Sequence, residues 1–142
     1  MKIVAVSGGF VPLHIGHLEN IRGAKSFGYL MVILTRDDQL LKKKGYVFMP
    51  YKERRAILES LRWVDMVVEN IDTDLSSNAS LRFYRPNIFA RGGDILGKDN
   101  LRESATCKEL GIEIRTGTGG NEKIQSSQGL VRRANETILR HG

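Results

Sequence analysis

The sequence contains almost no cysteine and no long apolar run. Cys107 is the only cysteine among 142 residues, so the chain can form neither an internal disulfide nor a cysteine-rich metal site. No stretch approaches the roughly 20 apolar residues that a membrane-spanning helix needs, and the first residues lack the apolar core of a signal peptide. These absences predict a soluble protein without membrane contact, in a reducing, cytoplasmic setting.

The charge is unbalanced toward the basic side. Lys and Arg total 22 against 16 Asp and Glu, which gives a net charge of +6. This excess favours anionic partners such as nucleotides, sugar phosphates or nucleic acid. No RNA-binding motif and no interleaving of aromatic with basic residues occurs, so a nucleic-acid partner is not expected. The length indicates one domain over residues 1–142.

Short β-branched or apolar runs alternate with stretches of helical periodicity. The runs predict buried strands at 2–7, 29–35, 65–70, 87–92 and 112–116. The stretches between them predict helices at 16–27, 50–61, 76–84, 100–110 and 126–140. Strands that are apolar throughout need cover on both faces. The pattern therefore predicts an α/β fold, a three-layer α/β/α arrangement with a five-stranded parallel sheet.

The first strand runs into the segment SGGFVPLHIGH, which has the composition of a phosphate site. Gly8 and Gly9 permit positive φ and a close approach of the backbone to a ligand. A helix that begins near Gly16 would offer free N–H groups and its positive dipole end to an anion. His14 and His17 bracket Gly16, and each can donate hydrogen bonds to phosphoryl oxygens.

This segment resembles the G-x-F-D-x-x-H-x-G-H signature of the cytidylyltransferase-like nucleotidyltransferases. The class I aminoacyl-tRNA synthetases share the His-x-Gly-His piece but need a far longer chain. The resemblance implies a Rossmann-like fold, His14 and His17 as catalytic residues, and backbone contacts to a nucleotide from the loop residues Gly8, Gly9, Phe10 and Gly16. Val11 stands where the family usually has Asp.

Two later segments also resemble the family. TRDDQLLKKKG matches a region in which a Lys before a Gly reaches the nucleotide phosphates, which implies a catalytic role for Lys44. Lys42 and Lys43 are interpreted as solvated surface residues. MPYKERRAILESLRWVD matches a Pro-x-x-x-Arg pattern at a helix start, which implies that Arg54 contacts phosphate. An arginine at this position can instead pair with an acidic residue.

Two segments nearer the carboxyl end complete the resemblance. RPNIFARGGD is similar to a glycine-rich turn of the family and implies nucleotide contacts from Gly92 and Asp94. A capping or turn role is the alternative for Asp94. IQSSQGLVRR is similar to the motif that opens the last helix, and implies that Ser126 and Ser127 hold a phosphate.

The resemblance implies in-line attack by a phosphate oxygen of the acceptor on the α-phosphorus of a nucleoside triphosphate. His14 and His17 would stabilise the α-phosphate in the transition state, and Lys44 with Ser127 would hold the β- and γ-phosphates. Mg²⁺ is expected as cofactor, bound chiefly by phosphates and water, because no set of metal-binding carboxylates is visible in the sequence.

The donor and the acceptor remain open at this point. The RGGD and Pro-x-x-x-Arg segments favour ATP and a sugar 1-phosphate, hence lipopolysaccharide or sugar-nucleotide biosynthesis. The alternatives are a cytidylyltransferase that uses CTP and glycerol 3-phosphate, and an adenylyltransferase of FMN. A non-catalytic nucleotide-binding module is the rival from another class, favoured by Val11. The family resemblance also implies a homodimer.

Overall fold

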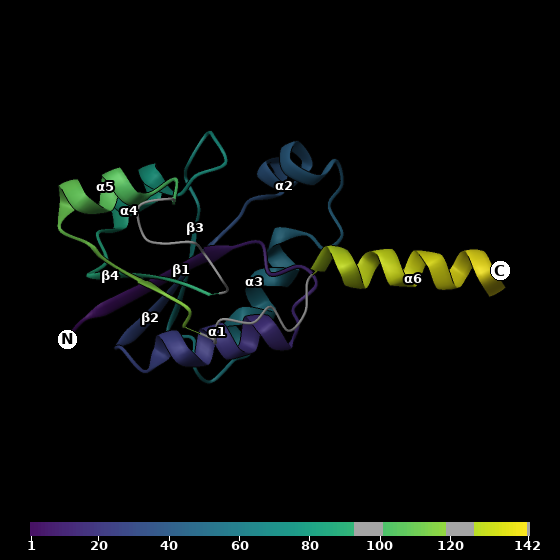
Figure 1. Ribbon diagram of the computed structural model, residues 1–142, viewed down its shortest axis with the longest axis horizontal. Coiled ribbons are helices and arrows are strands. Elements are labelled where there is room, and N and C mark those ends of the chain that lie inside the picture. Colours follow the sequence, from purple (N-terminus) through teal and green to yellow (C-terminus); the bar gives the residue numbers. More distant parts are fainter. Residues whose placement is uncertain (93–100, 119–126, 142) are drawn as a thin grey trace.

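A computed structural model of the chain describes residues 1–92, 101–118 and 127–141 (Figure 1). Its strands form one parallel sheet in the order β3-β2-β1-β4-β5. Their bounds are β1 Ile3–Gly8, β2 Tyr29–Leu34, β3 Met66–Glu69, β4 Ile88–Arg91 and β5 Glu113–Thr116. The α/β, Rossmann-like arrangement with five parallel strands is therefore confirmed.

The sheet is covered by helices on both faces, as fully apolar strands require. α1 (Ile15–Lys25) and α3 (Tyr51–Ser60) pack on one face, against the side chains of Val4 and Val6 and their neighbours. α4 (Asn78–Tyr84) and α5 (Ser104–Leu110) cover the other face. Alternate residues along the strands thus belong to two separate hydrophobic cores.

α6 (Ser127–His141) projects away from the body of the molecule in Figure 1. Its residues 132–137 are exposed. The five helices expected from periodicity are all present, each within a few residues of the expected bounds. Over the described residues, no helix combines the length and the apolar character that a membrane span demands.

The sequence analysis missed one further helix, α2 (Asp37–Lys44). It buries only Gln39 and Leu40, so it lacks the apolar stripe on which periodicity depends. Other signals were present in the sequence. Two acidic residues occupy its first turn and three lysines its last, as the helix dipole favours. Gly45 follows in the left-handed conformation with φ 82°, a frequent helix stop.

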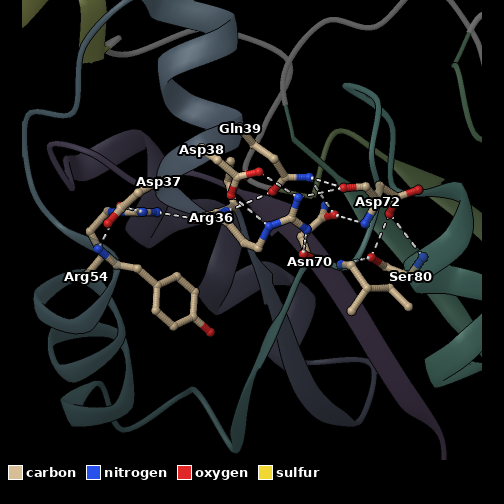
Figure 2. Close-up of polar contacts among 11 residues, drawn as sticks. Arg36, Asp37, Asp38, Gln39, Arg54, Asn70, Asp72 and Ser80 are labelled. Carbon is tan, nitrogen blue, oxygen red and sulfur yellow. Dashed lines mark hydrogen bonds and ion pairs between the residues drawn. The ribbon is translucent and has the colours of Figure 1, made fainter.

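A buried polar network holds α2 against the connection between β3 and α4 (Figure 2). The guanidinium of Arg36 donates to the carbonyl oxygens of Asn70 and Asp72. The side chain of Gln39 donates to Asn70 Oδ1 at 3.0 Å and to the Asp72 carbonyl at 3.0 Å. These bonds fix α2 at the carboxyl edge of the sheet.

The carboxylate of Asp72 caps the start of α4. It accepts from Ala79 N at 2.6 Å, from Ser80 N at 3.0 Å and from Ser80 Oγ at 2.7 Å, and the residue is only 2% exposed. Buried N–H groups without a partner are costly, so this side chain stabilises both α4 and the connection before it.

Replacement of Asp72 by alanine should therefore lower the free energy of unfolding by about 1–3 kcal/mol, because it leaves the buried N–H and hydroxyl of Ser80 and the N–H of Ala79 without their acceptor. Urea denaturation measures this as a lower midpoint with an unchanged slope. Glu59→Ala is the control: it breaks the exposed Arg55–Glu59 pair and should cost at most about 0.5 kcal/mol. Equal effects of the two substitutions would contradict the capping role.

Candidate active site

The histidine pair lies at the start of α1, where the first loop leaves the sheet. His14 is the N-cap: its Nδ1 accepts from Gly16 N at 3.1 Å and from His17 N at 3.4 Å. His17 reciprocates, and its Nδ1 accepts from His14 N at 3.2 Å. The two rings stack with centroids 3.7 Å apart and planes at 19°. The structure therefore brings together the two residues that the sequence singled out.

These hydrogen bonds decide which ring nitrogen carries the proton. A nitrogen that accepts from a backbone N–H holds no proton of its own, so each neutral ring is protonated at Nε2. Burial lowers the pKa of His17 to about 4, with smaller contributions from the charges of His14 and Lys44. His17 is thus a neutral Nε2–H donor at physiological pH, and it stands beside a second imidazole of the same orientation.

Phe10 shapes the loop beneath the pair. It has a φ of 51°, is buried, and packs its ring edge-on against His17 with centroids 5.0 Å apart. A Cβ on Gly8 would lie 3.3 Å from the Phe10 ring, and one on Gly9 would lie 3.1 Å from Leu40 Cδ2. The sequence analysis expected these glycines to allow positive φ. The structure uses them for close packing instead, and the left-handed residue is Phe10.

Val11, which replaces the family Asp, is buried and only 4% exposed. Its Cγ1 would lie 3.5 Å from a Cβ built on Gly9, so Val11 lies close against the backbone of this loop.

Lys44 ends α2 and is half-buried. Its charge contributes to the lowered pKa of His17, which shows that it acts within electrostatic range of the pair. Burial lowers the pKa of Lys44 itself, helped by the charges of Lys43 and Arg54. A cation held in this position suits a phosphate chain that runs past the histidines.

Arg54 is placed differently from the sequence prediction. It is only 1% exposed, and its guanidinium donates to the carbonyl oxygens of Met49 at 2.8 Å, Thr35 at 2.6 Å and Gly9 at 3.3 Å. It also pairs with Asp37 at 2.7 Å (Figure 2). The acidic partner, which the sequence analysis held as an alternative, is the one observed. Arg54 holds the loop from inside the protein, and the predicted phosphate contact is replaced by this positioning role.

Asn20 is a residue that the sequence analysis did not find. On α1, its Oδ1 accepts from the hydroxyl of Thr118, which follows β5. A Cβ on Gly92, after β4, would lie 3.0 Å from the Asn20 side chain. Asn20 therefore joins the loops after β4 and β5 to the helix that carries the histidines. In the sequence, only the position of this amide three residues after His17 indicated that Asn20 lies near the histidines.

The remaining predicted residues are only partly placed. Gly92 follows β4 directly, and Gly16 lies in the first turn of α1, where its N–H is taken by the His14 cap. Ser127 is the first residue of α6. Asp94 and Ser126 lie outside the described residues. Their roles stay predictions.

A cleft of about 430 Å³ opens at the carboxyl edge of the sheet. The ends of four strands line it, through Ser7 and Gly8 of β1, Thr35 after β2, Asn70 after β3 and Arg91 of β4. Lys43 of α2 also lines it, although the sequence analysis treated that residue as solvated surface. Within 1–92, 101–118 and 127–141, no three His, Cys, Asp or Glu side chains come together as a metal cage.

The site can therefore bind phosphate groups and stabilise charge on them. Two imidazole rings stack at the start of α1, and Lys44 contributes to the electrostatics of His17. No residue is needed to generate a nucleophile if the attacking group is itself an anion.

Comparison with known proteins agrees with this chemistry. A model of the cytidylyltransferase-like family matches residues 5–137. Glycerol-3-phosphate cytidylyltransferase of Bacillus subtilis is 32% identical over 99 residues, which cover 69% of this chain and 76% of that protein. FAD synthase of Pyrococcus abyssi is 33% identical over 115 residues, 80% of this chain and 72% of that protein.

Two further matches are more limited in what they show. The bifunctional protein HldE of Aliarcobacter butzleri is 33% identical over 101 residues, 69% of this chain but 21% of that protein. A crystal structure of a lipopolysaccharide core biosynthesis protein from Thermoplasma volcanium has the same fold, with a TM-score of 0.66 and 24% identity over 82% of this chain and 93% of that one. By its sequence and its fold, the chain belongs to the cytidylyltransferase-like family of nucleotidyltransferases.

Proposed function

We propose that this nucleotidyltransferase moves an adenylyl group from ATP to a phosphomonoester such as a sugar 1-phosphate, in sugar-nucleotide or lipopolysaccharide biosynthesis. An oxygen of the acceptor phosphate bonds to the α-phosphorus, and the bond from that phosphorus to the bridging oxygen breaks to release pyrophosphate. The observation that carries the proposal is the reciprocal cap of His14 and His17, which sets two Nε2–H donors side by side.

The donors would act on the charge that develops at the α-phosphate. The acceptor phosphate is already anionic, so the reaction needs positioning and charge stabilisation more than a general base. A neutral N–H donor fixed by the backbone requires no reorganisation when the charge appears. Lys44, near His17, supplies the positive charge that the leaving pyrophosphate needs.

Mg²⁺ is proposed as the cofactor, and it would neutralise the triphosphate. We expect the ion to be held mainly by phosphate oxygens and water. The protein would orient the phosphates through the histidine pair and Lys44.

Transfer of a cytidylyl group to glycerol 3-phosphate is the second candidate. It is supported by the similarity to glycerol-3-phosphate cytidylyltransferases, of which that from Staphylococcus aureus is 42% identical over 71 residues, 48% of this chain and 52% of that protein. Adenylyl transfer to FMN is supported in the same way by the FAD synthases. A binding module without turnover is a weaker candidate, because the sequence retains both histidines, His14 and His17.

A homodimer that acts in the cytoplasm completes the proposal. Phe48, Ile57 and Met66 are large apolar residues that are 54%, 39% and 41% exposed, and Met66 lies on β3 at the edge of the sheet. Cover by a second copy would remove this surface from water. A cytoplasmic place is consistent with Cys107, a buried free thiol whose pKa is raised by burial to about 11.

Pyrophosphate release with Mg²⁺, ATP or CTP, and a panel of phosphomonoesters tests the reaction. His17→Asn should lower kcat by about 10²–10³, because the amide oxygen can still accept from His14 N while the Nε2–H donor is lost. KM should change little. Lys42→Ala, on the exposed side of α2, is the control and should behave as wild type. Nucleotide binding without pyrophosphate from any pair would favour the binding module.

The lowered pKa of His17 also predicts a pH-dependent stability. Between pH 6.5 and about 4 the unfolded chain binds a proton at His17 that the folded chain does not. The free energy of unfolding should then fall as the pH falls, by up to about 1.4 kcal/mol per pH unit. Urea denaturation of His17→Asn should show a shallower slope over this range, whereas Lys42→Ala should keep the wild-type slope. Parallel curves for all three proteins would refute a neutral His17.

Light scattering after gel filtration tests the dimer. The wild type should elute with twice the chain mass of 15.9 kDa, and Met66→Glu should shift the population toward one copy because it places a charge in the proposed interface. A wild-type chain that stays a single copy at micromolar concentration would contradict the dimer.

A further inference from the structure

We propose that the cleft beside the histidine pair is the acceptor site, and that it selects a phosphomonoester rich in hydroxyl groups over one that carries a flavin ring. This inference rests on the nucleotidyl transfer proposed above. It also assigns specificity to Lys43 and Glu103, two residues to which the sequence analysis gave no role in binding.

The cleft and the histidines meet at the end of β1. Gly8 lines the cleft, and the Phe10 ring that packs over Gly8 also packs edge-on against His17. The imidazoles stand on α1, whereas the cleft is lined by the connections into α4 and α5, which cover the opposite face of the sheet. A molecule in the cleft can therefore present its phosphate to a nucleotide that lies over the start of α1.

Basic residues equip the cleft for the acceptor phosphate. Lys43, Arg91 and Arg102 all line it. Lys43 precedes Lys44 on the last turn of α2, and the two lysines serve different neighbours: the charge of Lys44 acts on His17, and Lys43 borders the cleft. Lys44 can thus bind the nucleotide while the adjacent Lys43 binds the acceptor.

The floor of the cleft is a fixed set of hydrogen-bonding groups. Glu103 is 5% exposed, and its Oε2 accepts from Ser77 N at 2.9 Å. The Ser77 hydroxyl donates to Ser7 Oγ at 3.1 Å and accepts from Asn70 Nδ2 at 3.4 Å. All four residues line the cleft. A carboxylate that is held in place without a cationic partner in this network is suited to accept hydrogen bonds from ligand hydroxyls.

The rest of the lining has the same character. Small-molecule pockets are mostly apolar or aromatic, with few polar groups. Among the described residues of this cleft only Leu75 and Leu101 are apolar, and none is aromatic. A flavin ring would lose water without gaining apolar or stacking contacts. Sugar or polyol hydroxyls would exchange hydrogen bonds with water for hydrogen bonds with the protein, so the lining favours them.

The test compares acceptors by pyrophosphate release, with ATP and CTP, using a hexose 1-phosphate, a heptose 1-phosphate, glycerol 3-phosphate and FMN. The best hydroxyl-rich acceptor should exceed FMN in kcat/KM by at least about 100-fold, which corresponds to two hydrogen bonds. A preference for FMN would overturn the inference and leave the transferase proposal intact.

Two variants then locate the selectivity. Lys43→Ala and Glu103→Gln should each raise the KM of the acceptor by about tenfold or more, without change in the KM of the nucleotide. Gln can still accept from Ser77 N, so the melting temperature of Glu103→Gln should stay near the wild-type value. An unchanged acceptor KM in Lys43→Ala, which lies on an exposed position and does not threaten folding, would overturn the assignment.

Direct binding separates the two proposals if no acceptor releases pyrophosphate. Calorimetry of the wild type with the same four phosphomonoesters, in the presence of a non-hydrolysable nucleotide analogue, should still show tighter binding of a hydroxyl-rich acceptor and its weakening by Lys43→Ala. That result would retain the cleft assignment and reject the transferase. Tighter binding of FMN, or binding indifferent to Lys43, would reject the cleft assignment.

Discussion

The buried guanidinium of Arg54 is the interaction on which the geometry of the site depends. It joins the loop after β1, the end of β2 and the start of α2, through Gly9, Thr35 and Asp37. A buried charge that loses its partners is costly, so these segments are held together as one unit. Arg54 therefore fixes the loop that leads to His14 relative to the end of β2 and the start of α2.

The hydrogen bonds that begin α1 also set the chemistry of the site. The Nδ1 atoms of His14 and His17 accept backbone N–H groups, so the Nε2 atoms carry the protons of the neutral rings. The contacts that cap the helix thus also set the tautomers that the proposed reaction requires. The strand order places β1 in the middle of the sheet, with its end between the histidines on one side and the cleft on the other.

The sequence predicted the five strands from their apolar runs, and it predicted that His14 and His17 meet at a helix start, because a spacing of three residues is local. It missed α2, whose stability comes from polar contacts with the distant Asn70 and Asp72. The direction of Arg54 and the place of Lys43 were also beyond it. Both depend on which segments the fold brings together. The sequence alone does not distinguish a basic residue that contacts a carbonyl from one that contacts a ligand or water.

The central proposal is that the backbone contacts of His14 and His17 set two Nε2–H donors side by side, where they would act on the α-phosphate. The most direct test is the ¹⁵N NMR spectrum of the histidine rings at pH 7, recorded before and after addition of Mg²⁺ and ATP. The structure predicts that His14 and His17 carry the proton on Nε2 in the free protein, and that these Nε2 signals shift when the nucleotide binds. A proton on Nδ1 of either ring, a charged His17, or Nε2 signals indifferent to the nucleotide would contradict the account.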